Sequence, residues 1–310
     1  LINDANRRRD MVEEGCIPAV TQSLSGGKLS ADSQEHAITV LAGLSVDRAN
    51  HDEIIKKHGI SPLIEALSAG HALSTTGKCN AAVGLAHLAA DDSERQSLIC
   101  DAIEPLVKWL VSCEEIEGAA LRPAAAHSLA SICRGNQDLQ KRVAQANAIK
   151  PLVSMLEQHA GADAHRAACG SLATLAVSST SNQKEIADVG AIPLLIDLMQ
   201  DPKPDICENA CFAVAMLSDL VDNKVLIANA GGIKPLIQVL STGNPAAQQF
   251  AARAASLLAL ENPDNQIALV LAAIPLADLL GSDSTETQEW AQLALLRLAL
   301  NPSNRNAIVK

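Results

Sequence analysis

Proline recurs through this chain at intervals of 40 to 46 residues, and no other feature limits the possible fold so strongly. Each of these prolines has glycine or alanine three residues before it and isoleucine one or two residues before it. The seven are Pro18, Pro62, Pro105, Pro151, Pro193, Pro235 and Pro275. A period of this length is typical of stacked arrays, in which no unit can bury its own apolar face. The sequence therefore predicts one continuous array over residues 1–310, in place of the two domains that length alone would suggest.

One unit, followed from Asn223, predicts three helices. Asparagine is suited to capping a short first helix, which ends at Gly231-Gly232 because glycine tolerates the left-handed turn after a helix. Pro235 then lies in the first turn of a second helix, where its missing N–H needs no partner. A longer third helix follows over about 246–260. The expected capping residue marks the start of each unit at Asn6, Asn50, Ser93, Asn136, Asn182, Asn223 and Asn265, with a partial unit from Asn304.

The third helix repeats most regularly. It contains an alanine, then a residue no larger than valine three positions later, then apolar residues four and seven positions after the alanine. This spacing places all four residues on one face of a helix. Small side chains on that face allow neighbouring helices to approach closely. The recurring alanines are Ala37, Ala81, Ala125, Ala168, Ala210, Ala251 and Ala291.

Three helices in about 42 residues, with these second and third helix patterns, resemble armadillo repeats over essentially the whole chain. The resemblance implies an all-α, right-handed superhelical solenoid whose third helices line a concave groove. Two-helix HEAT repeats are the nearest alternative, and the short first helix favours armadillo. The first residues resemble the tail of a third helix, and Lys310 falls inside another first helix. We therefore expect further repeats, or another domain, beyond both ends.

The importin-α branch of this family carries tryptophan on each third helix and asparagine four residues later, and both bind an extended peptide in the groove. The corresponding tryptophan positions here are Thr39, Val83, His127, Gly170, Phe212, Arg253 and Leu293. The asparagine positions are Gly43, His87, Ser131, Thr174, Met216, Leu257 and Arg297. Neither set contains tryptophan or asparagine, so this mechanism of binding nuclear localisation signals is disfavoured.

The same register selects candidate partner-binding residues. They are His87, His127, Ser131 and Thr174 in a polar N-terminal part, and Phe212, Met216, Phe250, Arg253, Leu257, Trp290, Leu293 and Arg297 in a more apolar C-terminal part. Aromatic anchors commonly dominate the docking of an amphipathic helix or extended motif. The alternative is that Phe250 and Trp290 pack between neighbouring repeats and that the histidines are ordinary exposed side chains.

Charge and composition exclude several classes of function. A net charge of −11 makes nucleic acid an improbable main partner. The basic run Arg7-Arg8-Arg9 is followed by acidic residues and predicts a solvated helix face, and Glu114–Glu117 predicts a solvated connection. Aromatic residues make up only 1% of the chain, which argues against an aromatic-lined pocket. No stretch is long and apolar enough to predict a membrane span. Eight cysteines without a C-x-x-C pair suit a reducing cytoplasmic or nuclear compartment.

No residue pattern nominates a catalytic or metal site. His159, His165 and Cys169 lie close in sequence, but a metal would need them to converge with a fourth ligand. Cys169, Cys207 and Cys211 fall in or beside the buried register, where a thiol behaves as a small apolar group. Common nucleophile, phosphate-binding and zinc-hydrolase motifs do not occur. We therefore expect no enzyme activity, cofactor or metal.

The resulting hypothesis is a non-enzymatic scaffold that binds a peptide or helical segment of a protein partner in the groove of the third helices. Two alternatives stay open: the substrate-recruiting arm of a larger enzyme such as a ubiquitin ligase, and a structural subunit of a cytoskeletal or axonemal assembly. The sequence predicts neither the partner nor the oligomeric state.

Overall fold

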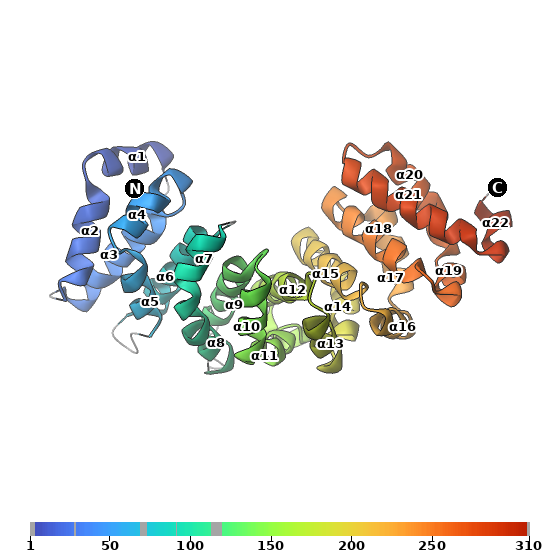
Figure 1. Ribbon diagram of the computed structural model, residues 1–310, viewed down its shortest axis with the longest axis horizontal. Helices are drawn as coiled ribbons and strands as arrows, with labels where there is room; N and C mark the ends of the chain where they lie inside the picture. The colour runs from blue at the N-terminus through green and yellow to red at the C-terminus, as the bar shows by residue number, and fades with distance from the viewer. Residues whose placement is uncertain (1–3, 28, 69–72, 91, 113–119, 309–310) are drawn as a thin grey trace. The chain divides into compact units, whose positions relative to one another are not determined.

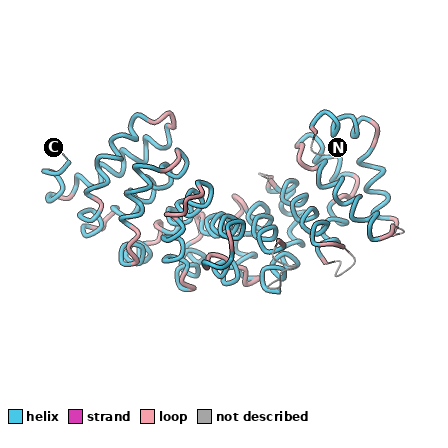
Figure 2. The backbone as a smooth tube through the Cα atoms, turned by 180° about the vertical axis from the view of Figure 1, so that it is seen from behind, coloured by secondary structure: helices cyan, strands magenta, loops and turns pink. Residues whose placement is uncertain are grey.

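A computed structural model describes residues 4–27, 29–68, 73–90, 92–112 and 120–308. Throughout these ranges the chain consists of helices and short connections, without a strand (Figure 2). This confirms the predicted all-α class. The acidic connection predicted at 114–117 lies outside the described residues.

The helices follow the predicted order of first, second and third helix (Figure 1). The first helices are α1 (Ala5–Glu13), α4 (His51–Lys56), α7 (Ser93–Ile99), α10 (Gln137–Gln145), α13 (Thr180–Asp188), α16 (Val221–Asn229), α19 (Pro263–Ala268) and α22 (Pro302–Ile308). The second helices are α2 (Cys16–Ser25), α5 (Ile60–Leu67), α8 (Ile103–Ser112), α11 (Ile149–Ser154), α14 (Ala191–Leu198), α17 (Ile233–Thr242) and α20 (Ala273–Asp278). The third helices are α3 (Ala31–Leu44), α6 (Thr75–Ala89), α9 (Leu121–Cys133), α12 (Ala162–Ala176), α15 (Pro204–Leu217), α18 (Pro245–Ala259) and α21 (Thr285–Leu300).

The recurring proline has the role that its spacing predicts. In every second helix it is the third residue, within the first turn, where backbone N–H groups lack an intrahelical partner. The left-handed turn before the second helix is also confirmed, since Gly190 has φ of 92° and Gly231 has φ of 81°. A side chain at either position would be strained.

The chain forms two compact units, Leu1–Pro151 (unit 1) and Leu152–Lys310 (unit 2). In unit 1, α3, α6 and α9 lie side by side in sequence order (Figure 1). In unit 2, α12, α15, α18 and α21 do the same. The recurring alanines from Ala81 to Ala291 are fully buried in these layers.

Adjacent third helices approach closely because small residues meet at their contact. A Cβ atom added to Gly84 of α6 would lie 3.1 Å from both Cα and Cβ of Ala42 in α3. Ser128 of α9 donates a hydrogen bond of 2.9 Å to the carbonyl oxygen of Ala82 in α6. We call the residues five positions after the recurring alanine, on helices followed by another third helix in the same unit, the small-residue seam: Ala42, Ala86, Ala173, Ala215 and Ser256. All five are at most 6% exposed.

The prediction that asparagine caps each first helix is wrong at most positions. Only Asn136 caps as expected, accepting from the backbone N–H of Leu139. Asn223 instead lies inside α16, 1% exposed, and donates to the carbonyl oxygens of Leu217 and Gln183. The same pair of bonds, to a leucine in the last turn of the preceding third helix and to the preceding repeat, occurs at Asn265 and Asn304. Asn50 and Asn182 make the first of these two bonds.

We call Asn50, Asn182, Asn223, Asn265 and Asn304 the asparagine ladder. The last carbonyl groups of a helix have no intrahelical donor, and a buried carbonyl without a partner is costly. The ladder supplies that donor. The actual caps stand earlier in the chain, at Asp4, Asp92 and Asn262 for α1, α7 and α19.

The basic run in α1 also differs from expectation at its centre. Arg7 and Arg9 are exposed, but Arg8 is only 8% exposed. Its guanidinium donates 2.7 Å and 3.0 Å hydrogen bonds to the two carboxylate oxygens of Asp47, beyond the end of α3. The Arg8 hydrogen bond lowers the pKa of Asp47. A sequence run gives no sign of this partner because it lies 39 residues away.

Candidate functional site

The predicted partner-binding residues lie along one side of the third helices. We define the third-helix face as the residue immediately before each recurring alanine and the residues two and six positions after it. Unit 1 contributes His87 on α6 and His127 and Ser131 on α9. Unit 2 contributes Thr174 on α12, Phe212 and Met216 on α15, Phe250, Arg253 and Leu257 on α18, and Trp290, Leu293 and Arg297 on α21.

Burial divides these residues into two groups. Met216, Leu257 and Thr174 are 1%, 8% and 5% exposed, so they offer little surface to a partner. The Thr174 hydroxyl donates to the carbonyl oxygen of Gly170 in its own helix. The other predicted residues are partly or fully exposed.

Phe212 and Phe250 stack between repeats. Their ring centroids are 4.6 Å apart with an angle of 26° between the planes. Phe250 stands immediately before the recurring alanine of α18, and Phe212 stands two residues after the recurring alanine of α15. These two positions therefore meet between adjacent third helices. Asn80 and Thr39 occupy the same two positions in unit 1 and form a 3.0 Å hydrogen bond. The two rings therefore pack between repeats, and both also stay partly exposed.

Arg253 and Trp290 occupy these two positions in the last pair of third helices. The Arg253 Cζ atom lies 5.1 Å from a Trp290 ring centroid, a cation–π arrangement. Arg253 also forms an ion pair of 3.4 Å with Asp219. The indole N–H of Trp290 donates to Glu286 at 3.4 Å. An aromatic pair and a cation–π pair therefore follow one another across α15, α18 and α21.

The last of the third helices, α21, exposes apolar side chains beside this row. Leu293 is 38% exposed, and it lines a surface depression together with Glu289, Gln292 and Leu296. Arg297, on the same helix, donates a hydrogen bond of 2.7 Å to the hydroxyl of Ser256 in α18.

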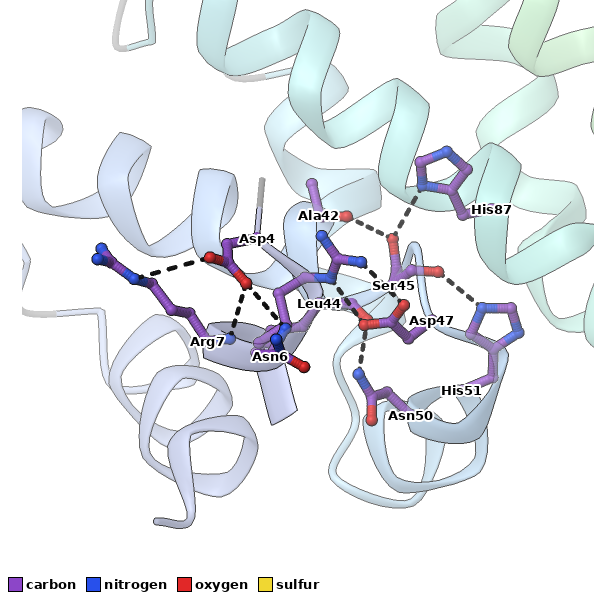
Figure 3. A network of polar contacts seen from close by, with 11 residues as sticks. Asp4, Asn6, Arg7, Ala42, Leu44, Ser45, Asp47, Asn50, His51 and His87 are labelled. Carbon is purple, nitrogen blue, oxygen red and sulfur yellow. Dashed lines mark hydrogen bonds and ion pairs between the residues drawn. The ribbon is translucent and has the colours of Figure 1, made fainter. Parts of the chain in front are cut away.

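Histidines dominate the polar part of the face in unit 1. His87 Nδ1 lies 3.4 Å from the Ser45 hydroxyl, and His51 Nε2 lies 2.7 Å from the Ser45 carbonyl oxygen (Figure 3). Arg95 contacts the other ring nitrogen of His51 at 2.5 Å. Burial, and then the neighbouring His127 and His51, lower the pKa of His87. Burial is also the main cause that lowers the pKa of His51, followed by Arg95 and Arg48.

These shifts predict that acidification weakens unit 1. Above a pH of about 6.5 both the folded and the unfolded chain hold neutral imidazoles. As pH falls below that value, the unfolded chain binds protons that the folded chain does not, so the free energy of unfolding decreases. We expect the melting temperature to fall between about pH 7.5 and about pH 5.5, and a His87→Asn variant to show a smaller fall. His36→Asn, at an exposed histidine of the same unit, is the matched control substitution. Equal pH dependence in the His87→Asn variant and the parent would contradict the assignment.

The residues considered for a metal do not converge. His165 is 9% exposed and its Nε2 lies 2.9 Å from the Glu157 carbonyl oxygen, while Cys169 is fully buried. His159 is exposed, near the carboxylate of Glu157. In the ranges that the structure describes, no three His, Cys, Asp or Glu side chains lie together in a way that could hold a metal ion.

The sequence interpretation overlooked Lys224, a buried cation whose side chain reaches the end of the third helix α18. Lys224 directly follows Asn223 of the asparagine ladder, and glutamine occupies the corresponding position after Asn182 and Asn265. Gln183 and Gln266 bond to carbonyls at the end of the preceding third helix. Lys224 is 4% exposed and bonds instead to the carbonyl oxygen of Leu260, after α18. A lysine at a register position that is glutamine in two other repeats was a signal visible in the sequence.

Length and hydropathy decide whether a described helix could span a bilayer. No single one is long and apolar enough to cross a bilayer, and α16 and α17 reach that length together only across a bend of 87°.

Comparisons with known proteins agree with the repeat architecture. The family model described as Armadillo/beta-catenin-like repeat matches residues 179–217, which contain α13, α14 and α15. An engineered protein of known crystal structure is 26% identical, with a TM-score of 0.85 over 99% of this chain and 74% of that chain. A designed armadillo repeat protein is 23% identical, with a TM-score of 0.68 over 76% of this chain and 98% of that one.

A second designed armadillo repeat protein, solved in complex with the peptide (KR)4, is 22% identical, with a TM-score of 0.65 over 76% of this chain and 98% of that chain. None of the curated proteins compared with the chain matches it. The three-helix repeat, its proline and alanine registers, the family match and these structures lead to one conclusion: the chain is an armadillo-repeat protein.

Proposed function

We propose that this protein is a non-enzymatic interaction scaffold that binds an extended or helical segment of a protein partner on the third-helix face of unit 2. The observation that carries the proposal is the row formed by the Phe212–Phe250 and Arg253–Trp290 pairs across three adjacent helices. All four side chains are partly exposed. Aromatic and arginine side chains are the types that most often dominate protein interfaces.

The comparisons support the kind of partner. One designed armadillo repeat protein with this fold was solved with a peptide bound. This chain presents different residues at the positions where the importin-α branch carries tryptophan and asparagine. We therefore carry over the mode of binding, a protein segment laid along third helices, and leave out the sequence preference of other armadillo proteins.

A peptide array or pulldown with the chain tests the proposal, followed by separate Phe212→Ala and Trp290→Ala variants. We expect each variant to weaken binding of the captured segment by about tenfold or more, because a buried aromatic anchor is worth about 2 kcal/mol. The melting temperature should change little, because each ring contacts one side chain of a neighbouring repeat and is already partly exposed. Val225→Ala is the matched control, because Val225 is 48% exposed on α16, away from the third helices.

Loss of melting temperature with unchanged binding in both ring variants would overturn the proposal. It would mean that the rings serve only to pack neighbouring repeats.

A further inference from the structure

Arg297 is a partly buried cation that has no acidic partner within the described part of the chain. Its Nη1 donates to the Ser256 hydroxyl at 2.7 Å, and no carboxylate among the described residues forms an ion pair with it. Burial alone lowers its pKa. A guanidinium has five N–H donors in a planar arrangement that matches a carboxylate. Arg297 therefore has donors to spare where solvent can still reach the side chain.

Two further cations belong to the same region: Lys224, whose pKa is lowered first by burial and then by the charge of Arg297, and Arg253 on α18, the helix whose Ser256 accepts from Arg297. The negative charge of Asp219 acts on the pKa of Lys224 in the opposite direction, and Asp219 itself forms an ion pair of 3.4 Å with Arg253. We call Lys224, Arg253 and Arg297 the cation cluster. Asp219 and Glu261 are the carboxylates near it, and neither forms an ion pair with Lys224 or Arg297 in the described chain.

The third-helix face has a charge opposite to that of the protein. The chain has a net charge of −11, yet no position of the third-helix face in the sequence is Asp or Glu. The charged or titratable residues on it are His36, His87, His127, Arg253 and Arg297. An anionic group is therefore favoured on this face locally, although the rest of the surface repels it. Charge complementarity of this kind selects among partners and fixes their register.

The apolar row and the cation cluster lie on the same helices. Trp290 and Arg297 are seven residues apart on α21, two helical turns along one side. Phe250 and Arg253 are neighbours on α18, one turn apart. On both α18 and α21 the aromatic ring therefore lies nearer the start of the helix than the guanidinium group. A segment lying across the two helices could contact both kinds of side chain.

Resting on the proposed function, we propose that this region is a carboxylate-binding subsite for an acidic, apolar-rich peptide segment, with Arg297 as the principal ligand of a Glu or Asp side chain. Lys224 contributes positive potential at the end of α18, and Phe212, Phe250 and Trp290 contact the apolar residues. Arg253 orients Trp290 through its cation–π contact. A basic segment would meet three cations, and nucleic acid would meet too few for phosphate binding on a strongly acidic protein.

Three short synthetic peptides test the subsite on the complete chain. They alternate Leu and Phe with Glu, with Gln or with Lys, and their affinities are measured by fluorescence anisotropy at low and at near-physiological salt. We expect the Glu peptide to bind about tenfold more tightly than the Gln peptide, because a hydrogen bond to a charged group contributes roughly 1.5–3 kcal/mol. The Lys peptide should bind most weakly, and the preference for Glu should shrink as salt rises.

Substitutions assign the effect to Arg297. Arg297→Gln should weaken binding of the Glu peptide about tenfold while leaving the Gln peptide unchanged, and this second measurement also shows that the face is still folded. Lys234→Gln makes the same charge change on the exposed side of α17 and is the control. Equal binding of the Glu and Gln peptides, or tightest binding of the Lys peptide, would overturn the subsite while leaving apolar docking in place. Failure of all three peptides to bind would contradict both the subsite and the proposed function of this face.

Discussion

Replacing Asn223 with aspartate is expected to lower the free energy of unfolding by about 4 kcal/mol at neutral pH. The Asn223 amide donates to two buried carbonyl oxygens, at 3.1 Å on Leu217 and 3.3 Å on Gln183. An aspartate carboxylate of the same shape has no donor and places a buried negative charge against these oxygens. Each lost hydrogen bond to a buried carbonyl costs roughly 0.5–1.5 kcal/mol, and an unpaired buried charge costs several more unless it takes up a proton.

The aspartate variant should also respond to pH in a particular direction. Burial raises the pKa of a carboxyl group, so the folded variant binds a proton more tightly than the unfolded chain. Its stability deficit should therefore shrink as pH falls toward about 4, where the protonated acid can donate one of the two lost bonds. Urea denaturation followed by circular dichroism at both pH values measures the difference.

Two companion variants separate charge from lost hydrogen bonds. Asn223→Leu should be destabilised by about 3 kcal/mol, without the recovery at acidic pH. Asn229→Asp is the matched control, because Asn229 is exposed at the end of the same helix and the charge there should cost only tenths of a kcal/mol. A stable Asn223→Asp variant would show that the asparagine ladder does not join the repeats.

The periodic elements were predictable from the sequence because each is fixed by local chemistry. Pro235 belongs in the first turn of a helix, and Gly231 tolerates the left-handed turn before it. Ala251 and its spaced partners define the buried side of α18. These signals depend on neighbours within about ten residues, so the sequence contains them directly, and seven repetitions remove ambiguity.

The role of asparagine could not be predicted in the same way. Asparagine near a helix start is favoured both as a cap, where its oxygen accepts, and as a buried donor, where its amide group donates. The choice depends on which carbonyls lie near it. For Asn223 these belong to Leu217 and to Gln183, which is 40 residues away. The partner of Arg8 was hidden for the same reason, since Asp47 is brought to it only by the fold.

The sequence could predict the positions of the candidate residues along their helices, but not how far each side chain is exposed to solvent. The spacing puts Phe212, Arg253 and Trp290 at related positions of successive third helices, where the structure has the pairs Phe212–Phe250 and Arg253–Trp290. It did not show that Met216 and Leu257 turn inward, because a side chain at the edge of a helix face is covered or left open by the neighbouring repeat. Nor did it show the pairing of Arg253 with Trp290, which depends on the close approach of α18 and α21.

That close approach depends on the small-residue seam. Ala215 of α15 is completely buried at the register where Ala42 of α3 touches Gly84. The corresponding residue of α21 is Leu296, which is 60% exposed. On α21, a large side chain at this register is exposed and fits. Between two helices that pack as closely as α3 and α6, a side chain of that size would have no space.

Substituting leucine for Ala215 should consequently be among the most damaging single changes in unit 2. Three added carbon atoms have no space between α15 and α18, and overpacking of a dense interior costs typically 1–3 kcal/mol and occasionally more. We expect a loss of about 3 kcal/mol in the free energy of unfolding, measured by urea denaturation. Ala215→Ser, which imitates the natural Ser256, should cost less than about 1 kcal/mol, and so should Leu296→Ala at the exposed position.

Peptide binding should respond as well, because the aromatic row spans the same helices. Spreading α15 from α18 would separate Phe212 from Phe250, whose rings are 4.6 Å apart. The Ala215→Leu variant should therefore lose affinity for a segment bound on this face even at temperatures where it stays folded, whereas Leu296→Ala should not. Undiminished stability in Ala215→Leu would mean that the seam tolerates wider spacing, and that small residues recur at this register for another reason.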